Sequence, residues 1–140
     1  MRNGVILGKL QALDETLAEL RSLGQVSEDM VRADWRTRRA IERDLQVLVE
    51  VVIDVCQRLL ALHNQTPAPT SADAVAVCIR LGILSEKAEY RRMVQFRNVV
   101  VHRYERVDVK VLVNIVNNNL RDFEQFRDEV RRNEEEDDRI

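Results

Sequence analysis

Residues 45–56 read LQVLVEVVIDVC, an almost unbroken run of aliphatic side chains. The only polar residues in it are Gln46, Glu50 and Asp54, which are spaced four apart and therefore form one narrow stripe on a helix. Every other face is apolar, so this helix must be covered on more than one side. The monomer core covers one flank, and either a neighbouring helix or a second subunit covers the other. A homodimer is a natural inference from this pattern.

The elements before and around this run are also helical. The run is predicted to belong to a helix from about Asp34 to His63, where the sequence NQTPAPTS with its two prolines ends it. Before it, an apolar stripe predicts a first helix that ends at Gly24, and Ser27 is placed to cap a short second helix. The stripe comprises Ile6, Leu10, Leu13, Leu17 and Leu20.

The second half of the chain predicts three further helices. After the proline loop, Ser71 can cap a short helix, and Ser85 can cap the next one. Asp108 has the character of an N-cap for a final long helix. The predicted fold class is therefore all-α, an antiparallel helical bundle of four main helices with short additional helices.

Length and composition agree with one helical domain. The chain has 140 residues, of which 45% are hydrophobic and 33% charged, with only four glycines and two prolines. Residues 1–132 are expected to form a single domain. The acidic residues 133–140 are expected to form a tail that frays.

The sequence indicates neither a membrane segment nor a secretion signal. No apolar run approaches the roughly 18 residues that a membrane-spanning helix needs, and the N-terminal sequence MRNGVILGKLQALDE soon becomes acidic. We expect a cytoplasmic protein with no membrane partner.

The thiols and imidazoles do not form a metal-binding pattern. Cys56 and Cys78 stand in apolar helical surroundings and are interpreted as buried thiols. The chain has two histidines, His63 and one that is discussed below, so a zinc cluster is not expected. We expect no metal and no cofactor.

The charge distribution permits local phosphate binding, although the net charge of −2 does not indicate a nucleic-acid-binding protein. Trp35, in ADWRTRR, is interpreted as a packing anchor rather than a base-stacking platform, because aromatic residues make up only 4% of the chain. Arginines gather in two groups, namely Arg36, Arg38, Arg39 and Arg43, and Arg91, Arg92, Arg97, Arg103 and Arg106.

The chemically richest stretch is RNVVVHRY, residues 97–104. It combines a cation for phosphate at Arg97, an imidazole for proton transfer at His102 and a modifiable hydroxyl at Tyr104. The pattern R-x4-H-x-Y is weak by itself. A surface arginine, a histidine at a helix end and a tyrosine packed at a corner would give the same three letters.

The context of this motif is more specific. The sequence AIERDLQVLVEVVIDVCQRLLA at residues 40–61 resembles the central helix of the HEPN superfamily, including its acidic pair at Glu50 and Asp54. GILSEKAEYRRMVQFRNVVVHRYERVD at 82–108 resembles the motif-bearing segment, and VLVNIVNNNL resembles the start of the last helix. The resemblance is closest to the HepT type, the toxin of a HEPN–minimal nucleotidyltransferase toxin–antitoxin pair. Arg103 departs from the small or acidic residue that is frequent in the family.

The resemblance implies the toxin of a type VII-like system, a metal-independent endoribonuclease with Arg97 and His102 as catalytic groups. It also implies that a cognate nucleotidyltransferase antitoxin neutralises the toxin by transferring AMP onto Tyr104. The chemistry fits: RNA cleavage by the 2′-hydroxyl needs a base, an acid and positive charge on the phosphorane. One histidine does not easily serve as both base and acid, which a symmetric dimer with two Arg97–His102 pairs resolves.

The sequence leaves two questions open: the roles of Asn98, Glu50 and Asp54, and whether the protein is catalytic. Asn98 can bind phosphate or cap the helix end, and Glu50 and Asp54 can orient Arg97 or His102 or simply form a solvated stripe. The alternative function is a non-catalytic HEPN module that binds nucleotide or a partner nucleotidyltransferase.

Overall fold

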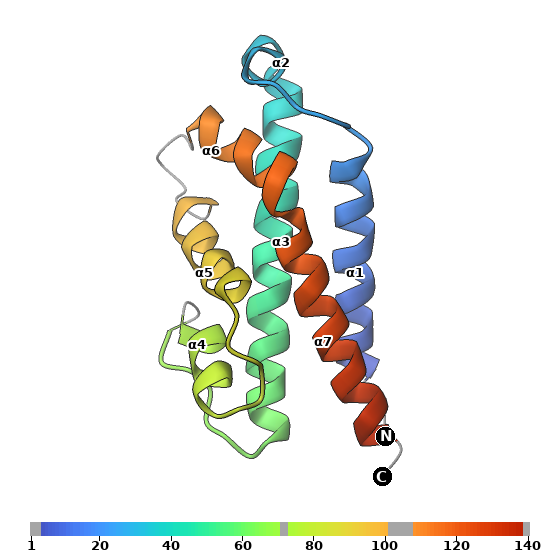
Figure 1. Ribbon diagram of the computed structural model, residues 1–140, viewed down its shortest axis with the longest axis vertical. Helices are drawn as coiled ribbons and strands as arrows, with labels where there is room; N and C mark the ends of the chain where they lie inside the picture. The colour runs from blue at the N-terminus through green and yellow to red at the C-terminus, as the bar shows by residue number, and fades with distance from the viewer. Residues whose placement is uncertain (1–3, 71–72, 101–107, 139–140) are drawn as a thin grey trace.

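The computed structural model describes residues 4–70, 73–100 and 108–138, and for residues 97–100 and 137–138 it describes the backbone alone. Every regular element in these residues is helical (Figure 1). In chain order they are α1 (Gly4–Arg21), α2 (Glu28–Ala33), α3 (Trp35–Leu62), α4 (Asp73–Arg80), α5 (Ala88–Val100), α6 (Val109–Asn114), a π-helical segment (Ile115–Asn119) and α7 (Leu120–Asp138).

Four long helices form an antiparallel bundle. α3 runs the length of the molecule, with α1 on one side, α4 and α5 on the other, and α7 across the front (Figure 1). α1 and α5 run towards the end of the bundle that carries α2 and α6, and α3 and α7 run back. This architecture confirms the predicted all-α bundle with short additional helices.

The core contains the aliphatic stripe of α1, the apolar faces of α3 and aromatic residues of α5 and α7. Its largest fully buried side chains include Tyr90, Phe123 and Phe126, and the rings of Tyr90 and Phe126 meet edge to face with centroids 5.9 Å apart. α3 contacts α1, α4, α5 and α7 of its own chain. The apolar residues of α3 are therefore covered by neighbouring helices, and this pattern does not require a second subunit.

The caps explain most of the helix boundaries. Ser27, Asp34 and Asp108 each accept a hydrogen bond from a backbone N–H in the first turn of the following helix, at 3.1, 3.0 and 2.9 Å. Gly24 and Gly82 have φ values of +67° and +76°, the left-handed conformation that follows many helix ends. These observations confirm the predicted caps at Ser27 and Asp108, and they show that Asp34, the predicted start of the long helix, is its N-cap. Ser71 lies outside the described residues.

The cap predicted at Ser85 is wrong. α5 begins at Ala88, and the backbone N–H of Ser85 donates to Oε2 of Glu129 at 2.8 Å. Glu129 lies on α7, 44 residues further along the chain. This long-range contact holds the segment before α5 extended, and local sequence patterns do not reveal it.

The last helix departs from the prediction in two places. A π-helical segment separates α6 from α7, and within it Asn117 accepts from the Val26 N–H at 3.0 Å and donates to the Val26 carbonyl at 2.8 Å. Asn117 thus ties the π segment to the turn between α1 and α2. α7 is described as helix to Asp138, so helix extends through most of residues 133–140, and Glu134 is buried.

Candidate functional site

The motif segment begins at the end of α5. Arg97 and Asn98 belong to the last turn of this helix, which is described to Val100. The chain resumes at Asp108, which caps α6. His102 and Tyr104 lie outside the described residues, so the geometry between Arg97, His102 and Tyr104 is not part of the described structure. What the structure does establish is how the two ends of the segment are held.

An ion pair fixes α5 against α7. Nε and Nη2 of Arg92 each lie 2.9 Å from a carboxylate oxygen of Asp122, in a two-pronged arrangement. Asp122 is fully buried, whereas the Arg92 side chain is 40% exposed. The carboxylate raises the pKa of Arg92, mainly through these hydrogen bonds. Arg92 is followed by Arg97 a little more than one helical turn later, so this pair anchors the motif-bearing end of α5.

A second polar contact holds the first turn of α5. The Tyr90 hydroxyl donates to Oε1 of Glu129 at 3.1 Å, and the same carboxylate accepts from the Ser85 N–H. Lys87 Nζ lies 3.8 Å from this carboxylate. Burial, together with the charge of Glu129, raises the pKa of Tyr90 above its usual range. Tyr90 is therefore a packed, neutral hydroxyl with a permanent partner.

The acidic pair on α3 faces solvent. Glu50 and Asp54 are both exposed. Oδ2 of Asp54 lies 3.2 Å from Nζ of Lys9 on α1, and both side chains of this ion pair are about half exposed, at 54% and 43%. Asp54 is thus paired with a residue of α1. Neither carboxylate contacts a described side chain of α5.

The second histidine of the chain is distant from the motif. His63 caps the C-terminus of α3, and its Nδ1 lies 2.8 Å from the Leu59 carbonyl. That end of α3 lies at the bottom of the view in Figure 1, whereas α5 ends in the upper half of the molecule. His63 is therefore not positioned to share chemistry with Arg97 within one chain.

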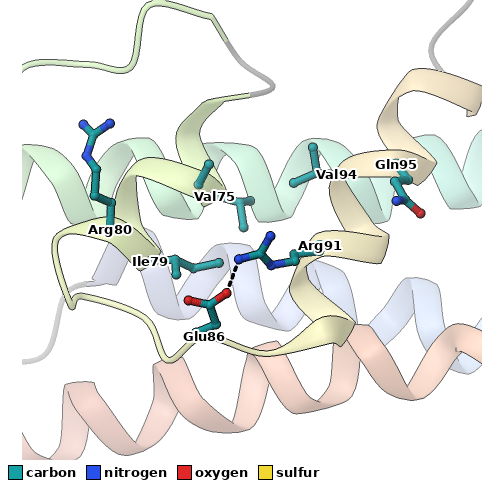
Figure 2. Close-up of a pocket in the computed structure, with 8 residues that line it drawn as sticks. Val75, Ile79, Arg80, Glu86, Arg91, Val94 and Gln95 are labelled. Carbon is teal, nitrogen blue, oxygen red and sulfur yellow. Dashed lines mark hydrogen bonds and ion pairs between the residues drawn. The ribbon is translucent and has the colours of Figure 1, made fainter.

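An open pocket of about 550 Å³ lies between α4 and α5. Figure 2 shows Val75, Ile79 and Val94 on its apolar side, and Arg91 pointing across it to an ion pair with Glu86. Arg80 lies at its edge. None of the residues that line it is a histidine, cysteine, serine or tyrosine, and its one carboxylate, Glu86, is engaged in the ion pair with Arg91.

The thiols and carboxylates give no metal site in the described part of the chain. Cys56 and Cys78 are both buried, as expected, and the Cys78 thiol points to the Cys56 carbonyl at 3.5 Å. Among the described residues, no group of three or more His, Cys, Asp or Glu side chains is placed to hold a metal ion. In the same residues, no helix has the length and apolar character to cross a membrane.

The interpretation of Trp35 as a packing anchor is wrong. Its side chain is 68% exposed at the start of α3, and the guanidinium of Arg36 lies 5.4 Å from its ring centroid. The flanking residues in ADWRTRR already indicate this exposure, because all of them except Ala33 are charged or polar.

The comparison with protein families covers most of the chain. The family model for HepT-like ribonucleases ("Ribonuclease HepT-like") matches residues 13–130, which include the whole segment 97–104. A protein of Shewanella oneidensis named mRNA nuclease HepT is 22% identical over 132 residues, which cover 92% of this chain and 98% of that protein.

Solved structures share the fold. A tri-AMPylated Shewanella oneidensis HEPN toxin in complex with MNT antitoxin superposes with a TM-score of 0.80 at 21% identity, covering 92% of this chain and 98% of that one. A toxin–antitoxin structure with AMP-PNP gives a TM-score of 0.80 at 20% identity over the same shares. The family model matches more than half of the chain, at residues 13–130, and this match shows that the chain belongs to the HepT-like ribonuclease family.

Proposed function

We propose that this chain is the toxin of a two-gene toxin–antitoxin pair and acts in the cytoplasm as a metal-independent endoribonuclease. Arg97 and His102 are its catalytic residues in this proposal. The observation that carries it is the family match over residues 13–130, which spans an intact RNVVVHRY segment. The relative named mRNA nuclease HepT gives further support, since this chain covers 98% of it.

The proposed reaction is an attack of the RNA 2′-hydroxyl oxygen on the adjacent phosphorus. The new 2′-O–P bond replaces the P–O5′ bond, which leaves a 2′,3′-cyclic phosphate and a 5′-hydroxyl. Arg97 supplies a permanent positive charge for the phosphorane oxygens. His102 transfers protons, since an imidazole titrates near neutral pH. No step in this scheme needs a metal ion.

The reaction needs one group to take the 2′ proton and another to protonate the 5′-oxygen. The chain has two histidines, and His63 follows the end of α3, which lies away from the end of α5 in Figure 1. We therefore propose a symmetric homodimer in which the second imidazole is His102 of the other subunit. Two Arg97–His102 pairs then share one cleft.

Tyr104 is proposed as the site of inactivation. The chain has two tyrosines, and Tyr90 is fully buried with its hydroxyl bound to Glu129. The buried, hydrogen-bonded Tyr90 is therefore a poor target for AMP transfer to the folded chain, which favours Tyr104 in this proposal. A nucleotide on Tyr104, two residues from His102, brings bulk and negative charge to the phosphate-binding site and so excludes RNA. The proposed donor is a cognate minimal nucleotidyltransferase antitoxin that uses ATP.

Asn98, Glu50 and Asp54 are not catalytic residues in this proposal. Asn98 follows Arg97 and is retained as a second phosphate contact. For Glu50 and Asp54, exposure and the ion pair between Asp54 and Lys9 favour the solvated stripe over the orientation of a catalytic group. The proposal therefore assigns no chemical step to these two carboxylates.

The experiment that tests the proposed function is induction of the chain alone in a bacterial host. We expect the wild type and His63→Ala to arrest growth and His102→Ala to permit it, at matched soluble expression. His63→Ala is the control, because it removes the other imidazole and leaves the motif intact. Arrest by all three variants, or by none, would contradict the proposed function.

A further inference from the structure

Trp35, the only tryptophan of the chain, is exposed over 68% of its surface. Asp34, the N-cap of α3, fixes the backbone at this position through its hydrogen bond to the Arg36 N–H at 3.0 Å. The ring therefore stands on the first turn of a long, rigid helix rather than on a loop. A single exposed aromatic ring is common on protein surfaces, so its significance here depends on its rigid position and on the residues beside it.

The residues beside Trp35 carry positive charge. Arg36, Arg39 and Arg43 are spaced i, i+3 and i+7 and so share one exposed face of α3, next to Trp35. We call Trp35 and these three arginines the α3 strip. By the helix rise, the three arginines extend along about 10 Å of the helix.

The charges of the α3 strip are only weakly neutralised. Arg36 lies over the Trp35 ring at 5.4 Å, and among the described residues it forms no ion pair. Arg43 donates to the neutral side chain of Gln46 at 3.4 Å. Arg39 lies 3.6 Å from Glu42, but its side chain is 71% exposed, and such a pair is weak in water.

The α3 strip lies at the end of the bundle towards which α5, the helix before the motif segment, points, and which carries α6, the helix after it. α2, which immediately precedes α3, packs against α6, and α6 is the first element after the segment 101–107. α5, whose last turn contains Arg97, points towards this same end (Figure 1).

From these placements we propose that the α3 strip binds single-stranded RNA on the approach to the cleavage site. A base stacks on the free face of Trp35, and the arginines bind the flanking phosphates. The proposal rests on the proposed function for the identity of the polymer. A second copy of this chain fits the surface less well, because a two-fold interface centred on the α3 strip would place its arginines against the same arginines of the other copy.

The test measures binding without cleavage. The purified chain is titrated with a short single-stranded 2′-O-methyl RNA, which lacks the attacking hydroxyl, and the fluorescence of Trp35 is followed. We expect saturable quenching, because Trp35 is the only tryptophan and a stacked base contacts its ring. Trp35→Ala, followed with a labelled oligonucleotide, is expected to bind at least about tenfold more weakly.

Salt dependence distinguishes RNA binding from a purely structural role. For the triple variant Arg36→Ala, Arg39→Ala, Arg43→Ala, the slope of log K against log salt is expected to fall by about 2, since each contact to a single-strand phosphate contributes about 0.7. Arg58→Ala, an exposed arginine further along α3, is the control and is expected to keep the wild-type slope. Thermal unfolding of each variant verifies that the fold is kept.

Two results would overturn the proposal. One is unchanged affinity and salt slope in both the Trp35 and the triple arginine variants. The other is a Trp35 signal that responds to the concentration of the chain itself, or to the nucleotidyltransferase, but not to the oligonucleotide. A wild-type chain that binds through the α3 strip but does not cleave natural RNA would instead contradict the proposed function and leave this inference intact.

Discussion

Some polar side chains of this protein are fully used in hydrogen bonds that hold the fold together. Glu129 binds the Tyr90 hydroxyl and the Ser85 N–H, and Asn117 binds both polar groups of the Val26 backbone. These groups hold segments together and are not available for chemistry. Arg97, His102 and Tyr104 could be proposed as candidates from the resemblance of the sequence around them, since their spacing alone is a weak pattern. The burial of Tyr90 could not, because it depends on a contact with α7.

The difference between the two tyrosines gives a direct prediction. When the chain is incubated with the nucleotidyltransferase antitoxin and ATP, Tyr104→Phe is expected to take up no AMP and to stay toxic in the presence of the antitoxin. Intact-mass spectrometry measures the added mass. Tyr90→Phe is the control and is expected to be modified as the wild type is. AMP transfer to the Phe variant at the wild-type level would refute Tyr104 as the target.

Asp44 gives a prediction about pH. Burial, together with the hydrogen bond and charge of Glu19, raises the pKa of Asp44 from 3.8 to about 6. The folded state therefore holds a proton that the unfolded chain has released, and between pH 3.8 and about 6 this group makes stability fall as pH rises. Asp44→Asn removes the effect. Because the site is partly solvated, the expected gain at pH 7 is about 1 kcal/mol.

The measurement is urea unfolding at several pH values across that range. Glu135→Gln replaces an exposed carboxylate of α7 and serves as the control, for which we expect the wild-type pH dependence. An Asp44→Asn variant with no gain at pH 7 and with an unchanged slope would contradict the assignment.

At the scale of elements, the caps and apolar stripes predicted most helices, while the exceptions arise from long-range contacts. Ser27 and Asp108 cap as predicted, and α3 begins next to Asp34 as predicted, because a cap is a local interaction. The start of α5 was misplaced because Glu129 of α7 binds the Ser85 N–H. The π segment has no signal in its own sequence, IVNNN, since its role depends on the distant Val26 backbone.

The attachment of α5 to α7 is testable through Arg92. Arg92→Ala leaves the fully buried Asp122 carboxylate without its partner, and we expect a loss of about 3 kcal/mol in the free energy of unfolding. Arg91→Ala is the matched control. It removes the adjacent arginine, which is 67% exposed in an ion pair with Glu86, and is expected to change stability by less than about 0.5 kcal/mol. Equal losses in the two variants would refute the anchoring role of Arg92.

At the scale of the whole molecule, the helical bundle could be predicted because apolar residues recur every three to four positions in each helix. The sequence did not predict which partner covers α3, since an apolar face is covered equally well by a neighbouring helix or by another subunit. In the structure, α1, α4, α5 and α7 provide this cover.

The proposed shared cleft predicts a non-linear loss of activity in mixed dimers. Wild-type and His102→Ala chains that carry different affinity tags are co-expressed, and the mixed dimer is isolated by two successive affinity steps. If one imidazole acts as base and the other as acid, the mixed dimer is expected to lose about a hundredfold in cleavage rate. A mixed dimer with half of the wild-type rate would show that each subunit acts alone.

The most direct test of the central claim is RNA cleavage by the purified chain in the presence of EDTA, with analysis of the ends produced. We predict that the wild type cleaves and leaves 2′,3′-cyclic phosphate and 5′-hydroxyl ends, and that His102→Ala, folded to the same extent, does not cleave. Cleavage that stops in EDTA, or that persists in His102→Ala, would contradict the account.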